Sequence, residues 1–271
     1  MKYKRLVVFI FCLLFPFMSL AQESSNIKEG TDIDRIFNLV PVKQTLTELP
    51  KDLKNQFTQN PFQISASKNS KLLRLYGEAY HADSLLKMAR KSFKENFDSN
   101  YADSVLTTLE SDKIKPILNA EAEFYTLQGT RKQIVTKYEL EQDKPSEEHI
   151  SIIKDLIEQS SAKKSALESQ TILFRSLVIG TDAISNNLNV SETQVNSIVN
   201  NFKNRLQMQL EDELVDNYLV MYHGLNNDRI RQYANFYATE AGTEFKESLN
   251  EAVHTAFKKA SEQLISNIES L

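Results

Sequence analysis

The sequence has no tryptophan, one cysteine, and only 6 glycines and 6 prolines among its 271 residues. Glycine and proline together make up about 4% of the chain, against roughly 12% in average usage. So few turn-forming residues argue against all-β folds, which need many tight turns. The apolar share of 41% and the charged share of 25% are those of an ordinary globular protein. Such a chain is long enough for one large domain or two smaller ones.

Residue patterns that announce a known chemistry are also missing. The chain has no Gly-x-Ser-x-Gly nucleophile elbow, no Walker loop and no dinucleotide-binding fingerprint. Its one cysteine, Cys12, lies within an apolar N-terminal run. We therefore predict no catalytic residues, no metal ligands and no cofactor, and we interpret the protein as a non-enzyme.

The N-terminus has the pattern of a secretory signal peptide. Lys2, Lys4 and Arg5 form a positive start, and the apolar run 6–17 is interrupted only by Pro16. Small residues at Ser19 and Ala21 then predict cleavage after Ala21, so that residues 1–21 are removed. The run of about a dozen residues is shorter than the roughly 20 that cross a bilayer, which disfavours a membrane anchor. A lipid on Cys12 is disfavoured because this residue lies in the middle of the run.

Removal of this segment takes away three of the 32 basic residues and none of the 36 acidic ones, which leaves a net charge of −7. An acidic chain of this kind disfavours nucleic acid and anionic membranes as partners. No second apolar run approaches the length of a bilayer. We expect an exported bacterial envelope protein, periplasmic or secreted. It would have no disulfide and would be held by its core.

Beyond residue 30, apolar residues recur every three or four positions, which predicts helices throughout and an all-α, multi-helix bundle. Ser191 and Gln194 form a capping box before the clearest helix, 193–222, and Gly224 follows its end. The other expected helices, by residue range, are 32–46, 48–58, 69–81, 84–109, 112–126, 130–140, 147–161, 164–180, a short helix after the turn at 224–228, and 243–269.

A weak internal repeat is the most informative pattern. Leu109-x-x-Asp112-x-Ile114 matches Leu225-x-x-Asp228-x-Ile230 at an offset of 116 residues. In both copies an aromatic pair and a glycine follow, at 124–129 and at 236–242, with one extra residue in the second. We predict two similar antiparallel helical halves, 22–140 and 147–271, joined by a polar linker at 141–146. The alternative is that two amphipathic helical halves look alike without duplication.

Residues 193–257 resemble a family of exported bacterial proteins. The resemblance is carried by Tyr218-x-x-Met221-Tyr222, by the turn 223–228 (His-Gly-Leu-Asn-Asn-Asp) and by the segment 236–242 (Phe-Tyr-Ala-Thr-Glu-Ala-Gly). The family is built on a domain of unknown function, number two thousand and fifty-nine of its series. Ala241 stands where this family usually has proline, and the copy in the first half is degenerate. The resemblance implies an exported helical domain and carries over no activity and no functional residues.

Two Glu-x-x-His pairs, Glu78 with His81 and Glu251 with His254, have the spacing found in di-iron helical bundles. A metal site in a bundle must point inward. The second pair instead shares its helix face with further polar residues, opposite an apolar stripe. We therefore interpret both pairs as solvated pairs on a helix surface. His223 is interpreted as a histidine that favours the helix dipole at a C-terminus, rather than as a general base.

Aromatic residues gather on the two helices that meet at the turn after residue 222. They form the candidate ligand or partner surface: Tyr218, Tyr222, Tyr233, Phe236 and Tyr237. The alternative is a packed core whose hydroxyls reach the surface. The sequence thus predicts a non-catalytic envelope protein that binds or assists an unknown protein partner. The second hypothesis is a carrier of a small apolar ligand in a cavity between the aromatic-rich helices.

Overall fold

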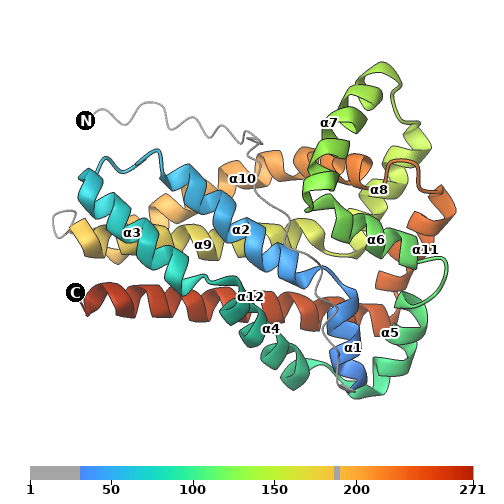
Figure 1. The fold of residues 1–271 in the computed structure, drawn as a ribbon, viewed down its shortest axis with the longest axis horizontal. Coiled ribbons are helices and arrows are strands. Elements are labelled where there is room, and N and C mark those ends of the chain that lie inside the picture. Colours follow the sequence, from blue (N-terminus) through green and yellow to red (C-terminus); the bar gives the residue numbers. More distant parts are fainter. Residues whose placement is uncertain (1–30, 186–189, 271) are drawn as a thin grey trace.

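The computed structural model describes residues 31–185 and 190–270, and within these ranges it contains helices and no strand (Figure 1). The prediction of an all-α, multi-helix bundle is confirmed. The predicted signal peptide, residues 1–21, and its cleavage site lie outside the described residues.

In the first half of the chain the helices are α1 (Asp32–Leu39), α2 (Val42–Phe57), α3 (Ala66–Ala79), α4 (Ala82–Asn96), the 3-10 turn η1 (Ser99–Tyr101), α5 (Ala102–Leu109), α6 (Lys115–Phe124) and α7 (Leu127–Gln142). In the second half they are α8 (Glu147–Gln159), α9 (Ala162–Ser185), α10 (Glu192–Met221), α11 (Asn227–Tyr237) and α12 (Glu240–Glu269).

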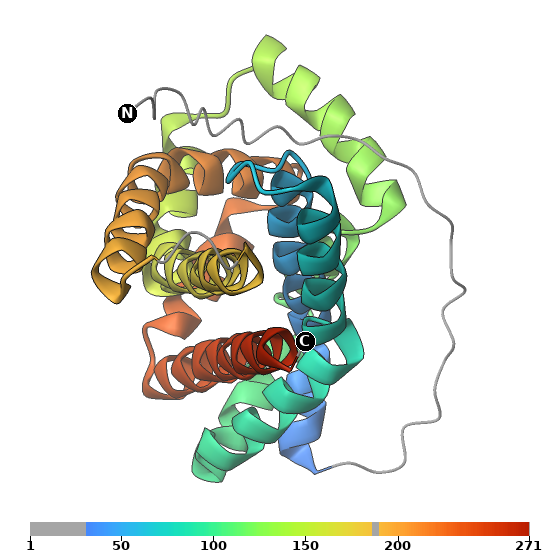
Figure 2. The same ribbon diagram turned by 90° about the vertical axis from the view of Figure 1, so that its left-hand side faces the viewer.

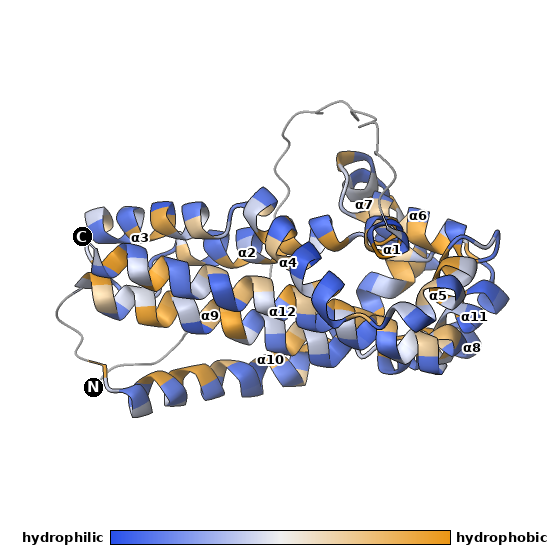
Figure 3. Ribbon diagram, turned by 90° about the horizontal axis from the view of Figure 1, so that it is seen from below, coloured by the Kyte–Doolittle hydropathy of each residue, from blue (hydrophilic) through white to orange (hydrophobic). Residues whose placement is uncertain are grey.

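The body of the molecule is built around α12. This helix makes its most extensive contacts with α4 and α9, and it also packs against α3. In Figure 2 the long helices α9 and α12 are seen nearly end-on, with α2 and α3 on one side and α10 on the other. Buried residues of both halves of the sequence belong to one hydrophobic core. Along α10 the hydrophobic residues face the neighbouring helices and the hydrophilic ones face away (Figure 3).

Alanines on α12 allow its neighbours to approach closely. Ala252, Ala256 and Ala260 are fully buried, as are the larger Phe245 and Phe257 on the same helix. Alternation of small and large side chains lets helices interdigitate in a close-packed core. The stripe predicted for the last helix is therefore its buried face.

Side-chain caps start most of the helices, and one of them is the capping box that the sequence predicts. The capping box of Ser191 and Gln194 is present, and Gly224 has the left-handed φ of 79° expected just beyond a helix end. Each such cap satisfies a backbone N–H group that the helix itself leaves free. Residues whose side chains accept a backbone hydrogen bond at a helix start are Thr31, Ser65, Thr126, Ser146, Ser191, Asn226 and Thr239.

Two predicted boundaries in the first half are wrong. The sequence places one helix at 32–46, but α1 ends at Leu39 because Val40 precedes Pro41 and takes an extended conformation, with φ −105° and ψ 150°. The next helix, α2, then continues through Pro50, which lies buried inside it. Tertiary burial of Pro50 outweighs the local cost of a proline within a helix.

The stripe predicted as one helix over 84–109 is broken at Phe97 and Asp98. The Asp98 side chain accepts a hydrogen bond from the backbone N–H of Asn100 at 2.9 Å, and its own backbone N–H donates to the carboxylate of Glu244 on α12 at 3.0 Å. An aspartate that bonds nearby backbone groups competes with the helix ladder. The break separates α4 from α5, and α5 packs against α1.

Two tight turns join short helices to the helices that follow them. In the first, the Thr126 hydroxyl donates to the carbonyl of Glu123 at 2.7 Å and accepts from the N–H of Gly129 at 3.0 Å. In the second, the Thr239 hydroxyl donates to the carbonyl of Phe236 at 2.7 Å and accepts from the N–H of Gly242 at 3.0 Å. The two turns therefore share one Thr-x-x-Gly hydrogen-bond pattern.

This pattern sets a register that differs from the one seen in the sequence. Aligning the threonines places Phe124 with Tyr237 at an offset of 113 residues, and no extra residue is needed before the glycine. The side chains seven residues after each threonine make equivalent hydrogen bonds in this register. Gln133 donates to the backbone carbonyl of Phe124, and Lys246 donates to that of Tyr237. The duplication itself stays a prediction.

Candidate functional site

The predicted tyrosines converge on a carboxylate that the sequence analysis did not single out. Glu121, on α6, accepts a hydrogen bond from the hydroxyl of Tyr222 at 2.7 Å. Tyr222 closes the C-terminus of α10 and is 1% exposed. The Glu121 side chain is half-buried, and its carboxyl group lies enclosed among the tyrosine rings. Residues from the middle and the end of the chain thus meet at one polar point inside the molecule.

A second hydroxyl extends this polar point on α11. The Tyr233 hydroxyl lies close enough to the Glu121 carboxyl to lower its pKa, and the Tyr237 hydroxyl donates to that of Tyr233 at 2.8 Å. The rings pack against each other, with centroids 4.9 Å apart for Tyr233 and Tyr237 and 5.4 Å for Tyr218 and Tyr222. We call these residues, Glu121 with its four tyrosines, the glutamate–tyrosine cluster.

Burial controls the acid–base behaviour of the cluster. Removal of the Glu121 carboxyl from water raises its pKa to about 7, although the hydrogen bond from Tyr222 and the nearby Tyr233 hydroxyl act in the opposite direction. Burial, together with the nearby carboxylate, raises the pKa of Tyr222 and of Tyr233 well above its usual value. The tyrosines therefore stay neutral donors, whereas Glu121 changes its charge close to neutral pH.

The cluster is a joint between helices rather than a surface. Tyr222, Tyr233, Phe236 and Tyr237 are all 8% exposed or less, and Tyr218 is partly buried against the same core. They join α10 and α11 to α6, so their contacts hold α6 in place. The sequence did contain a signal for Glu121. Glu121 follows the buried residues Ile117 and Leu118 by four and three positions. This spacing places all three side chains on the same face of helix α6.

A groove of about 560 Å³ lies elsewhere, between α5, α11 and the start of α12. Of the five predicted aromatic residues it includes Phe236 alone. Its remaining lining residues are Tyr101, Ser104, Thr108, Gln232, Asn235, Thr239, Glu240 and Ala241. The groove is therefore not the cavity between the aromatic-rich helices that the carrier hypothesis predicts.

The interpretation of both Glu-x-x-His pairs as solvated is wrong for His254. Its side chain is 6% exposed, with Nδ1 3.4 Å from the Glu168 carboxylate and Nε2 3.3 Å from the carbonyl of Ser165, both on α9. Because α12 is covered by α4 and by α9, its buried face is wider than the stripe of large apolar residues. His81, in contrast, is exposed at the start of α4. Within 31–185 and 190–270, no three or more potential ligands gather in a group that would hold a metal ion.

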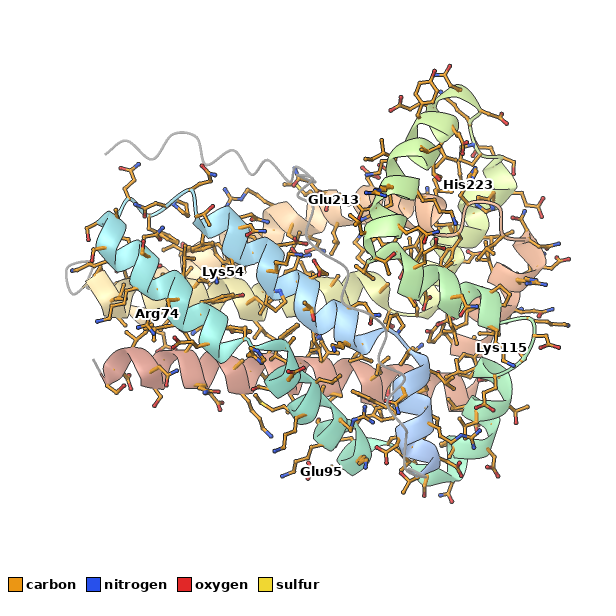
Figure 4. The ribbon with its side chains drawn as sticks, viewed as in Figure 1. Lys54, Arg74, Glu95, Lys115, Glu213 and His223 are labelled. Carbon is orange, nitrogen blue, oxygen red and sulfur yellow. The ribbon has the colours of Figure 1, made fainter. Side chains whose placement is uncertain are left out.

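The other histidine weighed in the sequence, His223, lies beside the hairpin formed by α6 and α7, residues 115–142, which we call the α6–α7 hairpin (Figure 4). Its Nδ1 is 4.0 Å from the carboxylate of Glu139 on α7. The histidine is half-exposed and lies between the C-terminal end of α10 and the hairpin.

The α6–α7 hairpin carries most of the exposed apolar residues in the described part of the chain. Five of the six large hydrophobic side chains exposed there belong to it, and the sixth is Met208 on α10. The five on the hairpin are Tyr125, Leu127, Ile134, Val135 and Tyr138. Helix α7 stands out from the body in Figure 1. This helix is the second candidate site, and sequence periodicity alone did not identify it.

Helix α7 is attached to the body along one side. Gly129 and Thr136 are buried, Leu140 packs against the core, and Gln133 donates to the backbone of α6. Leu127, Arg131, Ile134, Tyr138 and Glu141 are exposed, and their spacing of four, three, four and three residues places them on the opposite side of the helix. We call these five residues the outer face of α7.

No helix in the described part of the chain combines the length and hydropathy needed to cross a bilayer. Comparisons of the sequence with protein-family models and curated proteins, and of the fold with solved structures, found no match. The resemblance of residues 193–257 to a family of exported proteins stays a prediction.

Proposed function

We propose that this chain is an exported, non-catalytic protein of the bacterial envelope that binds a protein partner through the outer face of α7. Export is supported by the signal-peptide pattern at 1–21 and by the acidic charge of the remaining chain. A role in binding rather than catalysis is supported by the absence of familiar catalytic motifs from the sequence.

The concentration of exposed apolar residues on one small element carries this proposal. Isolated surface hydrophobics are common, whereas a contiguous group on a soluble protein marks a contact site. Ile134 is 51% exposed and Tyr138 is 65% exposed, and they lie four residues apart on the same face. A tyrosine beside an aliphatic residue supplies the large amphipathic contact area that is common at interaction hot spots.

The weak attachment of α7 points in the same direction. Short helices gain most of their stability from tertiary packing of an apolar face. In this 16-residue helix the buried residues are Gly129 and Thr136, which offer little apolar area. Of its large apolar residues Leu140 packs against the core, whereas Leu127, Ile134, Val135 and Tyr138 are exposed. Burial of the outer face against a partner helix would supply the missing packing.

The glutamate–tyrosine cluster has a supporting part in this proposal. Glu121 fixes α6 to α10 and α11, and the Thr126 turn then sets the direction in which α7 leaves α6. The cluster therefore positions the binding helix without touching the partner. In this proposal the outer face of α7 takes the place of the ligand or partner surface that the sequence predicts, which consists of Tyr218, Tyr222, Tyr233, Phe236 and Tyr237.

A site-specific photo-crosslinking amino acid tests the proposal in the exporting cell. Placed at Tyr138, it should give a discrete protein adduct of defined mass. The same amino acid at Met208, which is 74% exposed on α10, is the matched control and should give none. Equal labelling at both positions, or no adduct at Tyr138, would reject α7 as the binding surface.

A further inference from the structure

We infer that the partner of α7 is a second copy of this chain, and that two α7 helices pair antiparallel through their outer faces. This inference rests on the proposed function and adds to it the identity and the register of the partner. The outer face repeats with the four-three spacing of a two-helix seam, in the order Leu127, Arg131, Ile134, Tyr138 and Glu141. A seam of this kind is completed by another helix rather than by an irregular segment.

Charge complementarity selects the second copy and its direction. The seam has a cation, Arg131, in its N-terminal half and an anion, Glu141, at its C-terminal end, and both are exposed. Parallel pairing would set Arg131 against Arg131 and Glu141 against Glu141, which is repulsive at both ends. Antiparallel pairing brings each arginine to the glutamate of the other copy. The two ends of this face are therefore complementary to each other.

One register pairs Ile134 with Tyr138 and Arg131 with Glu141 at the same time. In an antiparallel pair of identical helices, facing residues lie at equal distances on either side of a common centre. A centre at the level of Thr136 sets Ile134 opposite Tyr138, two residues away on each side. The same centre sets Arg131 opposite Glu141, five residues away on each side. The result is two apolar contacts flanked by two ion pairs, related by a two-fold axis.

The size of this contact sets the expected affinity. A seam of one short helix per copy buries less area than a standard stable interface, which places it among weak, reversible contacts. We therefore expect a monomer–dimer equilibrium in the micromolar to millimolar range. Dimer formation also covers the exposed outer face of α7, so α7 should become more ordered as the dimer forms.

Sedimentation velocity of the exported chain, over micromolar to millimolar concentrations, tests this inference. The wild type should shift from monomer towards dimer as the concentration rises. Ile134→Asp should remain monomeric at every concentration. Met208→Asp, the matched control on α10, should associate like the wild type. Circular dichroism of each variant shows whether it keeps its helical content, so loss of folding is not mistaken for loss of pairing.

A charge exchange tests the register itself. Arg131→Glu and Glu141→Arg should each weaken self-association, because each places like charges together at both ends of the seam. Both substitutions combined in one chain should restore self-association to the wild-type level, because both ion pairs then re-form with their signs exchanged. A double variant that associates as weakly as the single variants would overturn the antiparallel register.

A wild type that stays monomeric would overturn self-pairing as a whole. The adduct formed at Tyr138 in cells distinguishes this failure from failure of the proposed function. An adduct of twice the chain mass supports the second copy. An adduct with a different protein overturns the second copy and leaves α7 as the binding surface. Without any adduct, both the inference and the proposed function are rejected.

Discussion

At the scale of the residue, Glu121 should make stability depend on pH. Its pKa rises from 4.5 to about 7 on folding, so the folded protein holds the proton more tightly than the unfolded chain. This contribution is complete below pH 4.5 and is lost as the pH rises through about 7. The size of the shift corresponds to about 3 kcal/mol in the free energy of unfolding.

Glu121→Gln isolates this effect, because glutamine still accepts the Tyr222 hydrogen bond but does not ionise. Urea titrations should show the wild type and the variant diverging between pH 4.5 and pH 7, with the variant more stable above pH 7. Burial and Glu48 also raise the pKa of Asp52, to about 6. Asp52 is present in both proteins, so both keep the part of the pH dependence of stability that this residue contributes. Identical pH slopes for the two proteins would contradict the enclosed position of the Glu121 carboxyl.

The glycines differ sharply in what a methyl group would meet. A Cβ at Gly129 would lie 2.0 Å from the carbonyl oxygen of Glu123, and one at Gly242 would lie 1.8 Å from that of Phe236. Alanine at either position should lower the free energy of unfolding by about 1–3 kcal/mol or more, since backbone cannot move aside cheaply. Thermal or urea unfolding measures this loss.

Gly77 is the matched contrast for these substitutions. It lies within α3, and the atom nearest to an added Cβ is the mobile Nζ of Lys54 at 2.8 Å. Gly77→Ala should therefore stabilise the protein by about 0.5–1 kcal/mol, because alanine is the better helix former. If alanine destabilised the protein equally at all three positions, the close backbone contacts at Gly129 and Gly242 would not be the reason that glycine is needed there.

At the scale of the element, the two Thr-x-x-Gly turns should behave alike locally and differ in their consequences. Thr126→Ala and Thr239→Ala each remove an N-cap and should each cost about 1 kcal/mol. Thr239 starts the central helix α12, so its loss should lower the stability of the whole protein. Thr126 starts the projecting α7, so its loss should mainly increase proteolysis within 127–142. If both variants lowered the stability of the whole protein equally, α7 would not be weakly attached.

The sequence predicted individual elements well wherever a local signal defined them. Ser191, Gln194 and Gly224 fix both ends of α10 through backbone hydrogen bonds that depend on neighbouring residues alone. The break at Asp98 was missed because the local hydrogen bond of its side chain to Asn100 is supported by a distant residue, Glu244 on α12, which accepts from the Asp98 backbone N–H. The continuation of α2 through Pro50 was missed for a similar reason, since its buried position is a tertiary effect.

At the scale of the whole molecule, the all-α bundle was predictable and the position of the candidate site was not. The tyrosines do converge across the turn at Gly224, as their helix faces indicate, but they converge on Glu121, more than ninety residues earlier in the chain. One sequence without tertiary contacts does not reveal that pairing. The exposed face of α7 was equally hidden, because an apolar stripe looks the same whether the body covers it or leaves it open.

The two halves share one core, because α12 packs against α4 of the first half and α9 of the second. The predicted division into 22–140 and 147–271 therefore describes the sequence rather than two separate packing units. The matching turns after α6 and α11 support a common origin for the halves, which remains a proposal. In that proposal α7 and α12 correspond, and α12 is covered by neighbours whereas α7 is not.

The central claim is that the outer face of α7 is completed by another copy of the chain. Amide hydrogen exchange, measured by mass spectrometry at low and at high protein concentration, tests it directly. Exchange within 127–142 should slow as the concentration rises, while the segment of α10 around Met208 stays unchanged. Exchange in α7 that is the same at every concentration would contradict the claim.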